Sequence, residues 1–236
     1  MAALLPPGAA PAALAGAAVS AGVPAGERAY RALRDRILEG VDPPGTMLGE
    51  AALAADLGMS RTPVRVALAR LQDEGWIVVY PKRGALVTGV SPAVAAELAD
   101  ARFVLESTAV DRASPQLRET LAARLAESVE GQREAFRRQD LRGFIDLTLR
   151  FHHGFVEAGG SSVLVELYER LADRHRFLLF AAGDRLLARC EEIIAEHQAL
   201  VEHLRAGDAP AFATALRAHI SQVTGERSGG TEDAHG

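Results

Sequence analysis

Cysteine is nearly absent, because Cys190 is the only one in the 236-residue chain, and this excludes a disulfide framework. Long apolar runs are missing as well. No stretch of 18 uninterrupted apolar residues occurs, so we expect no membrane-spanning helix. Residues 1–25 are rich in Ala, Pro and Gly but lack the basic start of a secretory signal. We therefore expect a cytoplasmic protein that begins with a disordered extension.

Aromatic residues are scarce at 5%, and an excess of positive charge is missing, since the formal net charge is −5. Ala and Leu supply most apolar positions and recur every three or four residues, which favours a helical body over a β-sandwich or barrel. Residues 26–90 hold nine basic and eight acidic side chains, so the acidity lies in residues 91–236. The first segment can therefore bind nucleic acid only by gathering a few cations on one face.

Residues 26–90 show the pattern of three helices followed by a hairpin. The helices are predicted at about 27–39, 50–57 and 61–74, and the strands at 76–80 and 85–90. The third helix turns Val64, Leu68 and Leu71 inward at spacings of four and three residues, so its arginines can face outward. A basic turn at 81–84 joins the two strands. This order predicts a winged helix-turn-helix.

Eight residues of this segment are candidate DNA contacts. A recognition helix presents donors from its first turn to base edges and phosphates in the major groove, and a wing adds cations for the DNA backbone or the minor groove. The candidates are Ser60, Arg61, Thr62, Arg65 and Arg70 on the third helix and Lys82, Arg83 and Gly84 in the wing. The competing interpretation is that the hydroxyls only cap the helix and the arginines form a solvated face.

The stretches PPGTML, LAADLGMSRTPVR, ALARLQDEGWI and RGALV carry a resemblance. They are similar to the GntR family of bacterial transcription regulators across residues 27–90. The resemblance implies that the hydroxyls and arginines at 60–65 face a palindromic operator read by two subunits, and that Gly84 lets the wing approach DNA closely. Val66 stands where the family usually has Glu, and Ala51 stands where some members carry a further arginine. These two departures leave the half-site sequence open.

Residues 91–224 predict six helices, at about 92–113, 115–138, 140–158, 162–181, 184–206 and 208–224. Pro and Gly breaks separate them, and an antiparallel bundle is the natural packing. The segment shows no phosphate loop, nucleophile elbow or paired-carboxylate site. Residues 225–236 are expected to form a disordered tail. The predicted fold is therefore mostly α, with an N-terminal winged helix-turn-helix followed by an all-α bundle.

Three histidines fall on the apolar stripes of three different bundle helices. His152 aligns with Ile145 and Val156, His197 with Ile193 and Val201, and His219 with Phe212 and Leu216. The neighbouring His153 is rotated by about 100° from its stripe, and His203 by about 120° from the His197 stripe. Two interpretations stay open. The three are hydrogen-bonded core residues, or they form a metal site, since imidazole binds Zn, Ni, Cu and Fe and bundles build such sites from facing helices.

A second resemblance covers most of residues 97–221. The stretches ADARFVLES, FHHGFVEAGGSSVLVELYERL, EHQALVEHLRAGD and ALRAHI resemble the FCD domain of the FadR subfamily of GntR regulators, which binds effectors and dimerises. The resemblance implies that His152, His197 and His219 bind a divalent metal ion, Zn or Ni in the first place. Thr148 stands where the family commonly has an Asp or Asn ligand, and Asp146 lies about 120° around the helix from His152. We therefore expect a three-histidine site with open positions.

Arg102 lies on an apolar stripe with Leu98, Leu105 and Ala109, an awkward place for a cation without a partner. Glu106, one turn further, supplies one partner, and on a helix surface such a pair contributes only about a few tenths of a kcal/mol. The FCD resemblance implies instead that Arg102 binds a carboxylate of a small organic acid, because the planar guanidinium matches that group with two parallel hydrogen bonds.

These patterns lead to one functional hypothesis. The protein is expected to be a homodimeric transcription regulator, in the first place a repressor, that binds double-stranded DNA and responds to a small organic acid in a metal-containing bundle. It is not expected to be an enzyme or to bind a membrane. Two alternatives stay open, a metal-dependent hydrolase or lyase, since three histidines also hold catalytic zinc, and a regulator that senses the metal itself. The first alternative lacks a general base on the same stripes.

Overall fold

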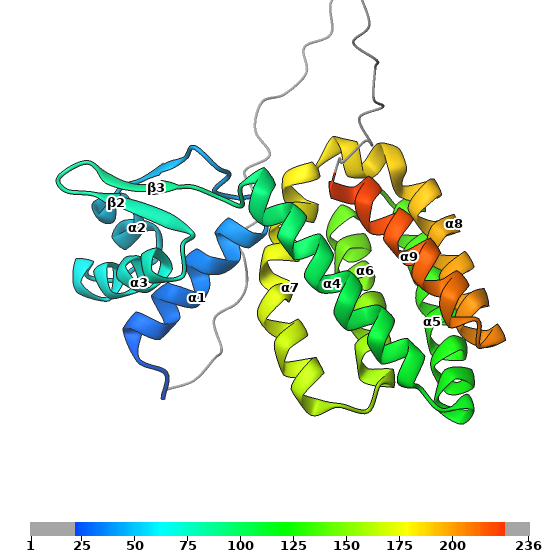
Figure 1. The fold of residues 1–236 in the computed structure, drawn as a ribbon. Helices are drawn as coiled ribbons and strands as arrows, with labels where there is room; N and C mark the ends of the chain where they lie inside the picture. The colour runs from blue at the N-terminus through cyan, green and yellow to red at the C-terminus, as the bar shows by residue number, and fades with distance from the viewer. Residues whose placement is uncertain (1–21, 225–236) are drawn as a thin grey trace, which may run out of the picture.

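The computed structural model describes residues 22–224 and folds them into two units (Figure 1). The N-terminal unit contains α1 (Ala25–Leu38), β1 (Met47–Leu48), α2 (Glu50–Asp56), α3 (Arg61–Asp73), β2 (Ile77–Tyr80) and β3 (Gly84–Val87). The second unit contains α4 (Pro92–Arg112), α5 (Pro115–Arg137), α6 (Leu141–Ala158), α7 (Ser162–Ala182), α8 (Asp184–Ala206) and α9 (Ala209–Thr224). The predicted fold class, a winged helix followed by a helical bundle, is confirmed. Most of the expected extension and all of the expected tail lie outside the described residues.

The small sheet of the first unit has one strand more than the sequence predicts. Its order is β1-β3-β2, with both pairings antiparallel, and Met47 faces Leu86 while Leu48 faces Ala85. Strand β1 is only two residues long, which is too short to leave the alternating pattern by which strands are predicted. Strand β1 ties the segment between α1 and α2 to strand β3 of the wing.

Gly84 is the first residue of β3, and the backbone of β1 passes close to it. Its φ is +114°, and a Cβ atom added there would lie 2.4 Å from the carbonyl oxygen of Leu48. The expectation drawn from the family resemblance is a glycine that lets the wing approach DNA. In the structure the close approach is to the backbone of β1, so Gly84 is required by the fold itself.

The bundle helices begin where side chains satisfy their first backbone N–H groups. The hydroxyls of Ser91, Ser114 and Ser161 accept hydrogen bonds from the amides three residues later, and Asp140 does the same for Gly143 at 2.8 Å. In α4 and α5 a proline follows the capping serine, as the fixed φ of proline favours in a first turn. These caps explain why the predicted boundaries agree with the observed ones within one or two residues.

The core of the bundle lies between α5, α6 and α8, with α4 and α9 packed on each other and on this group (Figure 1). Its largest fully buried side chains are Phe144, Phe151, Phe155 and Phe212. No helix in residues 22–224 is both long and apolar enough to cross a membrane. The four phenylalanine side chains fill the bundle interior, where a buried polar group without a partner is costly.

Replacing Gly84 by Ala should destabilise the winged helix. The positive φ alone costs a residue other than glycine roughly 1–3 kcal/mol, and the contact with the Leu48 carbonyl adds a steric penalty. The matched control is Gly45→Ala, which has φ +88° but open space around the added Cβ. Urea unfolding should give a clearly larger loss for Gly84→Ala than for the control. Equal losses would show that the approach to β1 is not the constraint.

Candidate DNA-binding face and candidate metal centre

The first turn of α3 presents polar side chains to solvent. Ser60 precedes the helix in an extended conformation, and its hydroxyl makes no capping hydrogen bond. Arg61, Thr62 and Arg65 are exposed, whereas Val64 is fully buried beneath them. The interpretation of Ser60 as a mere cap is therefore not supported by its geometry, and the face predicted to contact DNA is accessible.

Arg65 is held by one exposed ion pair. Its Nε donates to Oε2 of Glu50, at the start of α2, over 2.7 Å, while 64% of the Arg65 side chain stays exposed. Exposed ion pairs of this kind contribute little and are screened by salt. A DNA phosphate or base edge can therefore replace the Glu50 carboxylate at small cost, and Glu50 pre-positions the guanidinium.

Arg70 differs from the other predicted contacts on α3. Its Nη1 donates to Glu27 at 2.8 Å, its Nε donates to Glu74 at 3.1 Å, and its guanidinium carbon lies 3.6 Å from the ring centre of Tyr30. The Tyr30 hydroxyl also donates to Glu74 at 2.9 Å. Arg70 thus joins α3 to α1, and the structure gives it a packing role. The DNA contact assigned to it stays a prediction.

The wing residues Lys82 and Arg83 are exposed at the tip of the β2–β3 hairpin. Lys82 has a φ of 63°, which is uncommon for a residue with a side chain. The hairpin extends from the same end of the unit as α2 and α3 (Figure 1). Two exposed cations therefore lie at this tip, and their contact with a DNA backbone stays a prediction.

In the bundle, the three predicted histidines come together. His152 of α6, His197 of α8 and His219 of α9 are 0%, 0% and 3% exposed, and one ring nitrogen of each lies within 4.8 Å of the others. Nε2 of His152 is 3.2 Å from Nε2 of His219. The neighbouring His153 is partly exposed and pairs with Glu157, so the predicted difference between these adjacent residues is observed.

Each of these histidines is oriented by a partner on its other nitrogen. Nδ1 of His152 lies 2.8 Å from Glu106 Oε2, that of His197 2.7 Å from Gln132 Oε1, and that of His219 2.6 Å from Glu196 Oε2. A carboxylate or amide oxygen accepts, so each Nδ1 carries the proton. Such an arrangement fixes the ring and leaves Nε2 as the ligand atom, as outer partners do in metal sites.

In neutral rings with the proton on Nδ1, the Nε2 atoms face one another as acceptors. Two lone pairs 3.2 Å apart repel, and Nε2 of His197 is buried with no hydrogen-bond partner among residues 22–224. Burial holds the pKa values of His152 and His197 well below the ordinary value, with the charge of Arg102 acting in the same direction. Neutral imidazoles with converging lone pairs fit a divalent cation. This donor set is what zinc or nickel sites use.

Thr148 lies one turn before His152 and is 3% exposed. Its hydroxyl oxygen is buried without a hydrogen-bond partner in the described part of the chain. Asp146 cannot take its place, because it pairs with Arg176 of α7 at 2.7 Å. Within residues 22–224 the close group of possible ligand atoms consists of His152, His197 and His219. The three-histidine metal site stays a prediction.

Arg102 and Glu106 form a pair inside the bundle, where neither side chain is more than 4% exposed. Arg102 Nε donates to Glu106 Oε1 at 3.0 Å, and Nη1 donates to Nε2 of His175 at 2.8 Å. The hydroxyl of Tyr168 also donates to Glu106 Oε1, at 3.1 Å. Burial raises the pKa of Glu106 above its ordinary value, and the Arg102 charge opposes this. Three donors surround this carboxylate, and one of them is His152 of the histidine cluster.

Two of these residues, Tyr168 and His175, were not predicted as site residues. His175 is 4% exposed, and burial together with the Arg102 charge holds its pKa well below the ordinary value. A signal was present in the sequence, because His175 lies seven residues after Tyr168 and four before Leu179. Gln132 and Glu196 were missed too, because only the packing of α5, α8 and α9 shows which nitrogen they face.

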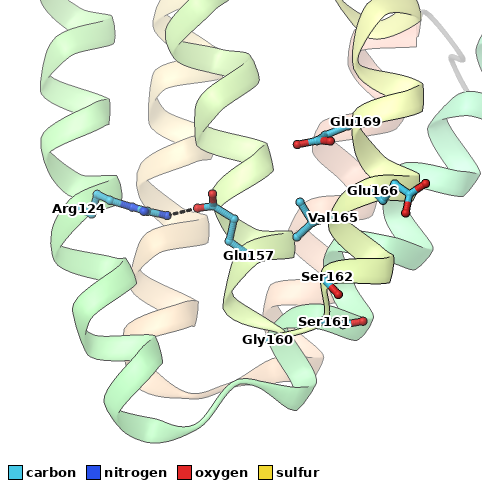
Figure 2. A pocket seen from close by; sticks show the side chains of 8 residues that line it. All are labelled: Arg124, Glu157, Gly160, Ser161, Ser162, Val165, Glu166 and Glu169. Atoms are coloured by element: carbon cyan, nitrogen blue, oxygen red, sulfur yellow. Dashed lines mark hydrogen bonds and ion pairs between the residues drawn. The ribbon is translucent and has the colours of Figure 1, made fainter.

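A separate groove of about 590 Å³ opens on the surface where α6 ends and α7 begins (Figure 2). Its lining residues are Arg124, Glu157, Gly160, Ser161, Ser162, Val165, Glu166 and Glu169. The Arg124 guanidinium donates to Glu157 across 2.6 Å. This ion pair neutralises part of the negative charge of the groove. None of the predicted site residues lines this groove, so the candidate site is the buried cluster.

Comparison with known proteins agrees with this architecture. Residues 25–87 match the family described as bacterial regulatory proteins, gntR family, and residues 97–222 match the FCD domain. The chain belongs to the GntR family. The protein is therefore a DNA-binding transcription regulator with an FCD domain, and not an enzyme.

Three similar proteins place this regulator among its relatives. A transcriptional regulator encoded in an unstable DNA locus of Streptomyces ambofaciens is 32% identical over 82% of this chain and 81% of its own length. The gluconate operon transcriptional repressor of Bacillus licheniformis is 26% identical over 85% and 84%. A GntR regulator structure from Rhodococcus sp. RHA1 shares the fold, with a TM-score of 0.71, 23% identity and coverage of 86% and 98%.

Arg65→Ala and Arg70→Ala should have different effects, the first on operator binding and the second on stability. Arg65→Ala should weaken specific operator binding by about 1–3 kcal/mol if the side chain reads a base, with little change in urea stability, because its ion pair is exposed. Arg70→Ala should lower the unfolding free energy, since it loses two carboxylates and the Tyr30 ring. Unchanged operator affinity in Arg65→Ala, measured at fixed salt, would contradict the assignment of the recognition face.

Proposed function

We propose that this GntR regulator is a repressor whose operator affinity is controlled by a small organic acid bound beside a divalent metal ion in the bundle. The observation that carries the proposal is the convergence of three buried Nε2 atoms whose Nδ1 atoms are already engaged. Through Glu106 this cluster connects directly to a buried arginine. A cation site beside a guanidinium is a site for an anion with more than one acceptor.

His152, His197 and His219 would hold the ion, and zinc or nickel suits three imidazoles. When bound, the ion supplies positive charge and open coordination positions for a ligand oxygen. Glu106, Gln132 and Glu196 keep the rings oriented. Because Thr148 offers only a hydroxyl, an acid oxygen would complete the coordination, and metal affinity should depend on the acid.

Arg102 supports a carboxylate as the effector group. Its guanidinium is buried, and its Nη2 lies 3.0 Å from Glu106 Oε1 without an aligned hydrogen bond. Planar guanidinium groups bind carboxylates with two parallel bonds. The name of the Bacillus licheniformis relative refers to gluconate, which is itself a small carboxylic acid. We therefore assign the effector to the class of small organic acids.

A homodimer that reads a palindromic operator completes the proposal. One chain carries one recognition helix, which fits one half-site, and two-fold related chains fit two. The bundle also exposes Val104 on α4 and Val163 on α7, each more than half accessible. These side chains are candidates for burial between subunits. Light scattering on the purified protein would measure the mass in solution.

Metal content should depend on His152 and not on its neighbour. His152→Gln should lower the affinity for Zn²⁺ at least about tenfold, since even loss of an outer partner costs 10–100-fold. His153→Gln is the matched control, because that ring is partly exposed and pairs with Glu157. Calorimetric Zn²⁺ titration of chelator-treated protein checks this. Equal affinities in the two variants would reject the histidine cluster as the metal site.

The change in operator affinity that an organic acid causes should depend on Arg102. In the wild type, gluconate or citrate added with Zn²⁺ should shift affinity for the DNA fragment upstream of the protein's own coding region. Arg102→Gln should reduce that shift at least about tenfold, because a hydrogen bond to a charged group is worth roughly 1.5–3 kcal/mol. A wild-type response to Zn²⁺ alone, unaltered by any acid, would identify a metal sensor instead.

A further inference from the structure

Helix α7 contacts both units, with different faces. Tyr168 and His175 lie seven residues apart on one face, and Phe177 follows two residues later, about 200° around the helix. Tyr168 and His175 bind the buried Glu106 and Arg102 in the bundle. Phe177, in contrast, is part of the core of the winged helix. A few residues of one helix therefore join the candidate effector site to the DNA-binding unit.

Phe177 packs closely in an apolar site formed by Trp76, Gly89 and Pro44, called here the Phe177 seat. The side chain is 3% exposed, and its ring centre lies 5.7 Å from that of Trp76 at an angle of 52°. Gly89 makes room for it, because a Cβ atom there would lie 2.8 Å from Cζ of Phe177 and 3.0 Å from Pro44. The amide of Trp76 donates to the carbonyl of Leu71 in the recognition helix α3, at 2.9 Å. Movement of this seat thus reaches α3.

Charged contacts surround the seat. Asp173 of α7 pairs with Arg34 of α1, and the Arg174 guanidinium lies 5.9 Å from the Trp76 ring centre. Between α6 and the end of α1, Arg142 donates to both oxygens of Glu39, at 2.8 and 2.6 Å. The contacts of Asp173 and Arg174 fix α7 against the winged helix, and the contact of Arg142 fixes α6 against it. A displacement of α7 therefore reaches the DNA-binding unit.

We propose that α7 couples the bundle site to the recognition helix through the contact between Phe177 and Trp76. A carboxylate that takes the donors of Arg102, or an ion on Nε2 that shifts His152 together with Glu106, changes the contacts of His175 and Tyr168. Buried polar groups must keep partners, and close-packed interiors pass on such shifts. The metal ion and the organic acid are those of the proposed function, and the inference rests on that function for these ligands. The route through α7 can be tested without them.

Trp76 makes the coupling measurable, because it is the single tryptophan of the chain. Zn²⁺ is added to the chelator-treated full-length protein while Trp76 emission is recorded, and affinity for the upstream DNA fragment is measured with and without the ion. The variants are Phe177→Leu, which removes the ring but keeps an apolar side chain, and Leu167→Ala. The latter is the control, because Leu167 lies on the same helix and is 44% exposed.

In the wild type and in Leu167→Ala, Zn²⁺ should change both Trp76 emission and operator affinity, the affinity by about fivefold or more, as coupled sites commonly do. Phe177→Leu should bind Zn²⁺ as the wild type does, but the change that Zn²⁺ causes in its own operator affinity should fall below about twofold. A full response in Phe177→Leu would overturn the proposal, because the signal would then pass through residues 88–91 into α4. Zn²⁺ that binds the wild type without changing Trp76 emission would overturn it as well.

If the wild type does not bind Zn²⁺, the metal part of the proposed function fails, and a second variant tests the coupling alone. Tyr168→Phe deletes one hydroxyl that donates to Glu106 inside the bundle. It should change Trp76 emission relative to the wild type, and the change should vanish when Phe177→Leu is added. Trp76 emission identical in Tyr168→Phe and the wild type would then count against coupling through α7.

Discussion

The buried carboxylate of Glu106 is the group on which the bundle interior depends. It is fully inaccessible and contacts Arg102 on its own helix, Tyr168 of α7 and His152 of α6. An ionised carboxylate in such a place is costly unless donors surround it, and here three side chains from three helices do so. The same group therefore stabilises the packing of α4, α6 and α7 and orients a candidate metal ligand.

The histidine cluster follows the same physical logic. Burial favours neutral imidazole, and partners on the Nδ1 atoms select one tautomer for each ring. Gln132 on α5 and Glu196 on α8 act on His197 and His219 as Glu106 acts on His152. The result is a set of inward lone pairs whose mutual repulsion a cation would relieve. Because the orienting groups come from α4, α5 and α8, the site can only exist when the bundle is assembled.

The DNA-binding unit uses arginine in two ways. Arg65 stays exposed with one replaceable partner, whereas Arg70 is fixed between α3 and α1 by two carboxylates and an aromatic ring. Two glycines also make room for other segments. Gly84 accommodates β1 of the same unit, and Gly89 accommodates Phe177 of the bundle. Of these residues, only Gly89 lies at the contact between the two units, where α7 packs.

The sequence by itself determined the order of helices, the winged helix and the three inward histidines, because periodicity, capping residues and motif spacing are local properties. It also separated His152 from His153, which one residue of rotation decides. Tertiary structure alone decided what the polar atoms face. Strand β1, the packing role of Arg70, the reason for Gly84, and the roles of Gln132, Glu196 and His175 all depend on segments distant in sequence. No periodic pattern records such contacts, since they arise only when separate helices pack and each buried donor must find an acceptor.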